Sequence, residues 1–374
     1  HGASDSLTLT LPVKVTDSDG SVITGSTTAV ITDAADPVIS AIESVRVEEA
    51  DLDASGSQRP GTTPTENGET AGGQVTIGAG SDRVASLELD VAAFNQANHL
   101  TSGGKEVTLA ARSPGWYLAS AEGGKPVFWV HLDVNGSYSV HLVGQLDHGA
   151  QGKDELGIEI PLFVTDSDGD RSPNVTVEVK VQDDMPIGTN LAHNLNETGS
   201  AVSGDLLPPA NEGADGARVA SVTVNGQPHA INGSLTLDVM SPDGKQVMGS
   251  LTIGQDGNYS FTPRPGFDHD AASLSQVISA QLVDGDGDIA ESTLTLNLQD
   301  EAVSFTVKAV TGQEDQGAQD PGHGIAIDMR LDIGDFDRGE HVEQLLVQAP
   351  ANAHGTFYYN GVALATTADG NWFI

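Results

Sequence analysis

The stretch IEIPLFVTDSDGD, residues 158–170, decides the interpretation of this sequence. Apolar residues occupy alternate positions in its first half: Ile158, Ile160, Leu162 and Val164. This is the period of a β-strand with one buried face. The strand runs directly into an acidic loop that contains a glycine, Asp166-Ser167-Asp168-Gly169-Asp170. We therefore predict a strand whose end presents several carboxylates together.

The same arrangement occurs twice more. Alternating apolar residues at 7–15 precede the loop 17–20, and a similar run at 278–282 precedes the loop 284–288. A second alternating strand follows each loop and ends at a second acidic cluster, which is Asp33 with Asp36, Asp183 with Asp184, and Asp300 with Glu301. The spacing from loop to cluster is 16, 17 and 16 residues (17 to 33, 166 to 183, 284 to 300). The sequence therefore contains an internal repeat.

The repeat places domain ends near residues 37, 187 and 302, with Pro37 and Pro186 interrupting the last strand of two copies. Residues 1–37 are predicted to be the C-terminal hairpin of a truncated β-sandwich, and 303–374 the N-terminal part of another. Residues 38–187 and 188–302 are predicted to be complete sandwiches. Helical periodicity is confined to 91–97 and 271–276. The predicted fold class is all-β, with antiparallel β-sandwiches in tandem.

Composition narrows the possible partners. The chain has 16 Lys and Arg against 53 Asp and Glu, a formal net charge of −37, which argues against nucleic acid or an anionic membrane surface and favours cations. A solvated surface would explain the total charge but not its clustering. There is no cysteine, so neither a disulfide nor a thiolate metal site holds the domains together. No apolar run is long enough to insert into a membrane.

Carboxylates at alternate positions, with a glycine that lets the backbone fold around them, suit Ca²⁺, which takes about six to eight oxygen ligands. An EF-hand would need Gly and Glu where Arg171 and Val177 stand, and the tandem glycine-rich nonapeptides of a β-roll are missing. One such loop alone would be an ordinary Asp/Gly turn. Recurrence favours calcium, because adjacent unpaired carboxylates repel one another. The predicted loop ligands are Asp17, Asp19, Asp166, Asp168, Asp170, Asp284, Asp286 and Asp288.

The acidic clusters at the domain ends predict a second kind of calcium site, between units. Asp183 and Asp184 lie beside the start of the next unit, whose early acid is Glu197. The corresponding residues elsewhere are Asp33, Asp36, Glu48, Glu49, Asp300 and Glu301. A further acidic loop contains Asp335, Asp337 and Glu340. The alternative is a polar linker that binds no ion.

Ordered motifs extend this interpretation. Those of unit 38–187 lie at 100–107, 127–128, 136–138, 146–148, 164–170 and 183–186, and those of unit 188–302 at 203–206, 213–216, 224–226, 259–261 and 267–269. The first set resembles the large repeat of type I-secreted RTX adhesins, and the second is similar to the cadherin-like repeats of the same giant bacterial proteins. The first loop departs from the pattern at Ser21, where a third Asp belongs, which puts its calcium affinity in doubt.

The resemblance implies Ig-like or cadherin-like sandwiches that bind Ca²⁺ and form an extended stalk in cell adhesion and biofilm formation. It implies a secreted or bacterial cell-surface location, with neighbouring repeats of the same chain as partners. Cell-surface glycans or proteins would be bound through other domains. It also implies an export signal and an RTX β-roll near a C-terminus that this sequence does not include.

Enzyme motifs are missing: there is no His-Glu-x-x-His, no Gly-x-Ser-x-Gly and no phosphate-binding glycine loop. We therefore expect no catalytic activity. The alternative to a stalk is a calcium-dependent carbohydrate- or ligand-binding module, in which Trp116, Tyr117 and Trp129 stack on a sugar, although core packing would also explain these rings. His148 and His269 follow Asp in matching motifs, and we expect structural hydrogen bonds from them.

Overall fold

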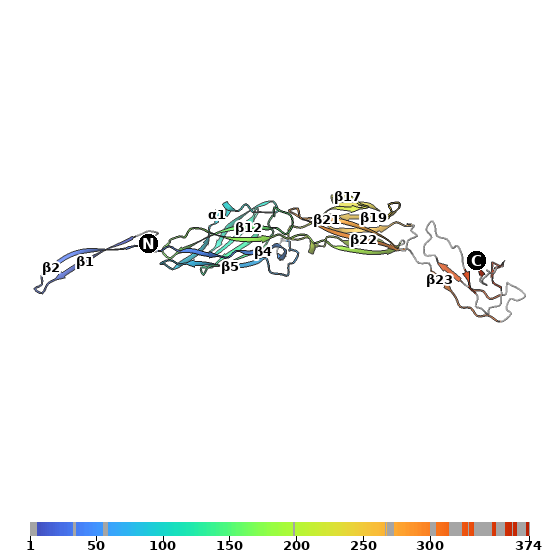
Figure 1. The fold of residues 1–374 in the computed structure, drawn as a ribbon, viewed down its shortest axis with the longest axis horizontal. Coiled ribbons are helices and arrows are strands. Elements are labelled where there is room, and N and C mark those ends of the chain that lie inside the picture. Colours follow the sequence, from blue (N-terminus) through green and yellow to red (C-terminus); the bar gives the residue numbers. More distant parts are fainter. Residues whose placement is uncertain are drawn as a thin grey trace.

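The computed structural model describes residues 6–32, 35–54, 59–196, 199–265, 267, 273–299, 304–313, 324–327, 329–332, 346–348, 356–360, 362–364 and 372–373. Figure 1 shows an elongated chain, with a two-stranded hairpin at one end and two β-sandwiches following one another along the long axis. The all-β, tandem antiparallel sandwich prediction is confirmed. The domain boundaries remain predictions.

The hairpin consists of β1 (Ser6–Thr16) and β2 (Val22–Thr32), which pair antiparallel over their full length. Leu7 lies opposite Ile31, and Val15 lies opposite Ile23. These apolar side chains are exposed, Ile23 to 75%. The acidic loop 17–20 forms the tip of the hairpin.

The first sandwich comprises strands β3 to β13. One sheet has the order β3 (Val38–Ile42), β5 (Thr70–Gly78), β11 (Ser137–Leu142), β10 (Lys125–Leu132), β9 (Trp116–Ala121), β8 (Lys105–Ser113) and β7 (Thr101–Ser102). The other has the order β4 (Val45–Glu48), β13 (Val175–Gln182), β12 (Glu155–Asp166) and β6 (Val84–Leu89). Alternate residues of both sheets fill one core, and the alternating residues Ile158, Ile160, Leu162 and Val164 are each at most 1% exposed.

The second sandwich comprises strands β14 to β22. One sheet has the order β14 (Asn190–Asn196), β22 (Ile289–Gln299), β21 (Leu274–Val283), β16 (Arg218–Val224) and β17 (Gln227–Ala230). The other has the order β15 (Val202–Asp205), β20 (Asn258–Pro263), β19 (Val247–Gly254) and β18 (Ser234–Met240). Phe261, Leu251 and Ile278 are fully buried in a second, separate core.

The last part of the chain contains short pairs. They are β23 (Ser304–Val307) with β24 (Met329–Asp332), β25 (Leu346–Val347) with β28 (Trp372–Phe373), and β26 (Tyr358–Tyr359) with β27 (Val362–Ala363). All three pairs are antiparallel.

Helices contribute little to the fold. The helical turn predicted at 91–97 is α1 (Val91–Ala97), where Asp90 caps the N-terminus by accepting from the N–H of Ala93 at 3.0 Å. Two 3₁₀ turns, η1 (Glu49–Asp51) and η2 (Pro209–Asn211), complete the set among the described residues. The second helical candidate, 271–276, is wrong from Leu274 onward, because the alternation of β21 begins there. No helix in the described ranges has the length and apolar character that a membrane span requires.

Each sandwich contains one parallel strand pair, and the pair in the first sandwich positions the site. β4 pairs parallel with β13, with Glu48 opposite Gln182, and β14 pairs parallel with β22, with Asn196 opposite Gln299. Paired parallel strands end at the same edge of a sheet. Glu49 after β4 and Asp183 after β13 therefore come together, although 134 positions separate them in the sequence.

A glycine opposite a tyrosine recurs in both sandwiches. Gly73 of β5 faces Tyr138 of β11, and Gly204 of β15 faces Tyr259 of β20. A Cβ at either glycine would lie inside van der Waals contact with the tyrosine ring. Each tyrosine therefore packs over the backbone of the neighbouring strand, and only glycine leaves the space for it.

We expect Gly73→Ala to lower the free energy of unfolding by about 1–3 kcal/mol, because the added methyl group overlaps the ring of Tyr138. Gly157→Ala in β12 is the matched control, since its nearest atom, Oε1 of Glu178, is 3.7 Å from the added Cβ. This control should be neutral or slightly stabilising. Chemical denaturation measures both, and equal losses would contradict the packing argument.

Candidate metal centre at the junction of the two sandwiches

The acidic loops share one backbone conformation. In loop 284–288, Oδ1 of Asp284 accepts from the N–H groups of Gly287 and Asp288 at 3.0 and 2.7 Å. Loop 166–170 repeats this pattern at 3.1 and 2.8 Å. The fourth residue of each loop has a φ that favours glycine, +94°, +105° and +110° at Gly20, Gly169 and Gly287. The repeat identified from sequence is therefore a structural repeat.

Loop 284–288 extends from the second sandwich to the first. The backbone N–H of His148 donates to Oδ2 of Asp286 at 3.2 Å, and that of Gly152 donates to Oδ1 of Asp288 at 2.8 Å. Nε2 of Gln151 donates to the carbonyl oxygen of Gly287 at 3.2 Å. The loop was expected to form a site within its own unit, whereas the structure places it in the junction.

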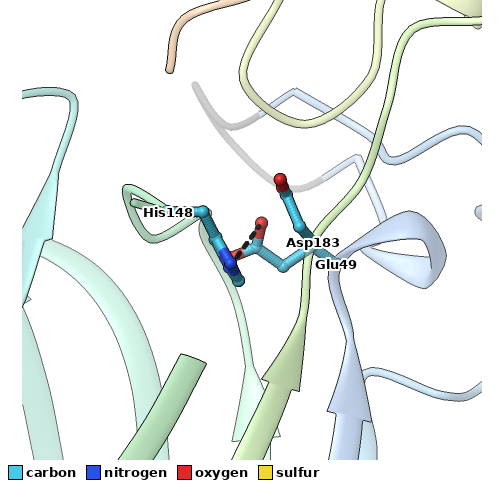
Figure 2. A group of neighbouring side chains, drawn as sticks. All are labelled: Glu49, His148 and Asp183. Atoms are coloured by element: carbon cyan, nitrogen blue, oxygen red, sulfur yellow. Dashed lines mark ion pairs between the residues drawn. The ribbon is translucent and has the colours of Figure 1, made fainter. Parts of the chain in front are cut away.

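Glu49 and Asp183 meet this loop from the first sandwich. Glu49 follows β4 and Asp183 follows β13, so the parallel register brings them to the same edge. Glu49 is fully buried and Asp183 is 1% exposed. Figure 2 shows the Glu49 side chain directed at His148, which lies on a separate loop, and Asp183 on the neighbouring strand end. Nε2 of His148 is 3.8 Å from Oε2 of Glu49.

His148 makes the structural hydrogen bond that was predicted for it. Its Nδ1 is 2.6 Å from Oδ1 of Asp154, and its side chain is fully buried. Asp147, which precedes it, accepts from the N–H groups of Gly103 and Gly104 at 2.6 and 2.8 Å. His269 and its preceding Asp lie outside the described residues. The Asp-His pair of the first sandwich therefore fixes the loop that faces the junction.

Asp184 is a cross-tie between the sandwiches. Its carboxylate accepts from the N–H and hydroxyl of Thr62 at 2.9 and 2.5 Å, and from the N–H of Ala214 at 3.0 Å. Thr62 belongs to the first sandwich and Ala214 to the second, yet Ala214 packs in the core of the first. Both oxygens of Asp184 accept hydrogen bonds, so this residue ties the two sandwiches together, and its assignment as a calcium ligand stays a prediction.

Other buried oxygens at the junction have no donor. Among the described residues, seven carboxylate oxygens there make no hydrogen bond: Oε2 of Glu49, Oδ1 and Oδ2 of Asp183, and one oxygen each of Asp215, Asp284, Asp286 and Asp288. Within the same ranges, no Lys or Arg pairs with any of these six residues. Buried charges without partners are strongly unfavourable.

The pKa values reflect this crowding. Burial raises the pKa of Asp183 to about 9, and the charges of Asp286, Asp215 and Asp288 add to the shift. Burial, then the charges of Asp286 and Asp284, raises the pKa of Asp215 to about 8. Burial also raises the pKa of Asp284 to about 7.

Burial is also the main cause that raises the pKa of Glu49 well above its usual range, followed by the charge of Asp215. Without a cation, the cluster therefore retains protons at neutral pH. Proton retention and cation binding are the two ways to neutralise these carboxylates.

The donor set fits calcium. Asp183, Asp286 and Asp288 each offer an oxygen within 4.8 Å of the others, and Glu49, His148 and Asp183 form a second overlapping group. Hard carboxylate oxygens are the ligands that Ca²⁺ prefers, and seven unpartnered oxygens are in the range that it takes.

A second acidic group lies at the other end of the first sandwich. Asp82, Asp166 and Asp168 offer oxygens within 4.8 Å of one another. The N–H of Ser81 donates to the carbonyl of Ala35 at 3.0 Å, which brings the segment beside Asp36 to this end. This end is the counterpart of the 284–288 end of the second sandwich, because loop 166–170 has the same conformation.

The remaining predicted ligands are distributed as follows. Asp17 and Asp19 lie at the exposed tip of the hairpin, and Asp36 is exposed. Glu48 is half-buried and forms an ion pair with Arg46 at 3.3 Å. Asp170 is buried in its loop. The residues outside the described ranges are Asp33, Glu197, Asp300, Glu301, Asp335, Asp337 and Glu340.

Glu197 was expected beside Asp183; it lies outside the described residues, so that assignment stays a prediction. Among the described residues, Glu49 lies at the same sheet edge as Asp183. The sequence argument also missed Asp82, Asp154 and Asp215 as site residues. For Asp215 a signal existed, because it lies in one of the ordered motifs, 213–216.

No protein-family model matches the sequence. No curated protein matches it either. Solved structures with similar chains include extracellular cadherin domains 3–6 of protocadherin gamma B2, at 13% identity and a TM-score of 0.26, covering 83% of this chain and 61% of that one. Mouse protocadherin-24 EC1–3 is 12% identical with a TM-score of 0.26, and the match covers 79% of this chain and 80% of that one. The D00-D0 domain of intimin is 10% identical with a TM-score of 0.22, and the match covers 70% of this chain and 98% of that one.

This chain thus spans less than two thirds of the protocadherin gamma B2 chain. Because the TM-scores are low, the fold class and the site argument stand on the strands, hydrogen bonds and unpaired oxygens of this chain itself.

The raised pKa values predict the pH dependence of stability without calcium. An unfolded Asp titrates near pH 4, whereas Asp215 and Asp183 in the folded chain hold protons up to about 8 and about 9. The folded state therefore binds more protons than the unfolded state across this window. We expect the free energy of unfolding in metal-free buffer to fall as pH rises from about 6 to about 9, and saturating calcium to remove the decline.

Thermal melts across this range, with and without calcium, measure the effect. The double substitution Asp183→Asn with Asp215→Asn should remove most of the decline of stability with pH in metal-free buffer. Asp238→Asn, an exposed residue of β18, should leave it unchanged. A metal-free protein that becomes more stable toward pH 9 would contradict the proton-holding cluster.

Proposed function

We propose that this chain is a calcium-stabilised extender segment, or stalk, of a secreted or surface-anchored bacterial adhesin of the RTX type, acting in cell adhesion and biofilm formation. The observation that carries the proposal is the set of seven buried, unpartnered carboxylate oxygens shared by two sandwiches. An enzyme needs one catalytic site, whereas here the acidic loops recur with the same geometry along the chain. A recurring ligand set suits a structural ion.

Calcium would supply positive charge where the two sandwiches meet. Glu49 and Asp183 would hold it from the first sandwich, and Asp215, Asp286 and Asp288 from the second. Bound in this way, the ion opposes separation or rotation of the two sandwiches, since either movement strips it of ligands. Without calcium or protons, the same carboxylates repel one another and loosen the joint.

Direct contacts already define the orientation of the joint. Asp184 bridges Thr62 and Ala214, and Arg59 forms an ion pair with Glu212 across the junction. The N–H of Ile187 also donates to the carbonyl of Asn211 at 3.0 Å, which ties the linker to the second sandwich. These contacts are few, so the ion adds rigidity to a joint that is already aligned.

The shape suits a spacer. Figure 1 shows the two sandwiches aligned end to end along the long axis of the chain. A rod of this kind places whatever it carries at a distance from its point of attachment, and its reach depends on the stiffness of each joint. The extracellular location and the adhesive role are part of the same proposal.

Calcium should raise the free energy of unfolding by about 2.7 kcal/mol per independent site at a free concentration 100 times Kd. Magnesium should substitute poorly, because it requires a tighter octahedral shell. Asp183→Asn should be more stable than the wild type in chelator at pH 8, because a buried Asn is neutral without taking up a proton, whereas Asp183 must be protonated on folding. It should also lose most of the calcium effect. Melts with calcium, magnesium and chelator test this.

The matched control is again Asp238→Asn, which should behave as the wild type in all three buffers. Identical melting temperatures for the wild-type chain in calcium and in chelator would overturn the proposal. A calcium effect that survives Asp183→Asn in full would move the ion away from this junction.

Calcium should also extend the folded chain. Small-angle scattering of the whole chain is expected to give a larger maximum dimension and less flexibility in calcium than in chelator, because the ion binds oxygens from both sandwiches at once. Circular dichroism at the same temperature checks that both sandwiches stay folded. An unchanged scattering profile with intact folding would show that no ion stiffens the joint.

A further inference from the structure

A cavity of about 600 Å³ lies on the outer face of the seven-stranded sheet of the first sandwich. It is formed across strands β8 to β11, and its main lining side chains are Arg112, Trp116, Trp129, His131, Ser139 and His141. None of the junction carboxylates lines it. The cavity is therefore separate from the candidate calcium site.

Strand alternation explains why these side chains face outward. Tyr117, Val130 and Val140 are buried in the core, so their neighbours along each strand point to the opposite face. The hydroxyl of Tyr117 accepts from the N–H of Leu89 at 3.0 Å inside the sandwich. Of the three aromatic residues singled out from the sequence, Tyr117 thus serves the core, while Trp116 and Trp129 line the cavity.

Trp116 forms a fixed, solvent-facing ring in this cavity. Its side chain is 44% exposed. Its ring centroid lies 4.1 Å from that of His131 with 33° between the planes, and 6.3 Å from that of Trp129 with 78° between the planes. These two contacts hold the indole in one orientation. A flat apolar ring that is both exposed and held in place is suited to stacking against the C–H face of a pyranose.

Polar groups surround this ring in a defined register. His131 lies opposite Ser139, and Trp129 lies opposite His141 on the neighbouring strand. Nδ1 of His141 is 2.6 Å from the hydroxyl oxygen of Thr70, and this contact fixes the orientation of the imidazole ring. An apolar platform flanked by a few oriented polar groups is the usual composition of a small-ligand site.

Arg112 gives the cavity a preference for negatively charged ligands. Within the described part of the chain no carboxylate pairs with it, although acids outnumber bases by 53 to 16 in the sequence. No acidic residue lines the cavity. A guanidinium binds a carboxylate through two parallel hydrogen bonds, which favours an anionic group beside the stacked ring.

We propose that this cavity binds an acidic pyranose, of the uronic or sialic type, at the end of an otherwise neutral glycan. Trp116 stacks on the ring, Arg112 pairs with the carboxylate, and the histidines and Ser139 bind hydroxyl groups. A terminal residue is favoured over a polyanionic polysaccharide, because the chain's net charge of −37 repels a polyanion. The site gives the chain a binding role that does not depend on the extender function.

Tryptophan fluorescence of the whole chain in calcium-containing buffer tests the proposal, since two of its three tryptophans line the cavity. The probes are the methyl glycosides of glucuronic acid and N-acetylneuraminic acid, with that of glucose as a neutral comparison. At least one acid should change the fluorescence saturably and bind about tenfold or more tightly than the glucoside. No change with either acid, or equal binding of the glucoside, would overturn the proposal.

Variants assign the effect to the cavity. Arg112→Gln should raise Kd for the acidic sugar about tenfold and leave weak binding of the glucoside unchanged. Trp116→Ala should abolish both, with only a small fall in the melting temperature, because the ring is 44% exposed and outside the core. Arg218→Gln, an exposed arginine of the second sandwich, is the control and should have no effect. If Trp116→Ala alters self-association in sedimentation and no sugar binds, the face is instead a contact between copies, and the proposal fails.

Discussion

Repulsion among buried carboxylates is the constraint on which the arrangement of this chain depends. Glu49 and Asp183 on one side of the joint face Asp215, Asp286 and Asp288 on the other, and among the described residues no Lys or Arg pairs with them. Such a cluster is stable only when protons or a cation neutralise it. The stiffness of the joint therefore depends on the protons and cations in solution, whereas each sandwich is stabilised by an apolar core of its own.

The register of one strand pair creates this cluster. Because β4 runs parallel to β13, the two strands finish at the same edge, and the acids that follow them become neighbours. Loop 284–288 then approaches from the second sandwich, held by the N–H groups of His148 and Gly152. The same parallel pairing recurs between β14 and β22. In the first sandwich this topological feature thus places carboxylates at the end where the second sandwich is attached.

Much of the fold was predictable from the alternation of apolar residues and from the Asp/Gly turns between the strands. The alternation at 158–164 and 278–282 gave strands, and the Asp/Gly loops gave turns whose glycines need positive φ. Partners across the chain were not predictable in this way. Alternation shows which face a residue occupies, but not which strand pairs with it or in which direction. For that reason the sequence argument paired Asp183 with Glu197, which is close in sequence, and did not foresee that Glu49 and loop 284–288 lie beside Asp183.

A junctional site has a physical consequence that a core site would not have. An ion inside a sandwich would share its binding energy with folding, so that losing the ion would unfold the domain. Here both cores are closed by apolar side chains, and the direct tie through Asp184 persists without any ion. Binding at Glu49, Asp183, Asp286 and Asp288 therefore adds to the stability of the folded chain without being required to close either core, and it also resists bending between the sandwiches. The recurrence of the loop at 166–170, beside Asp82, extends the same logic to the opposite end of the first sandwich.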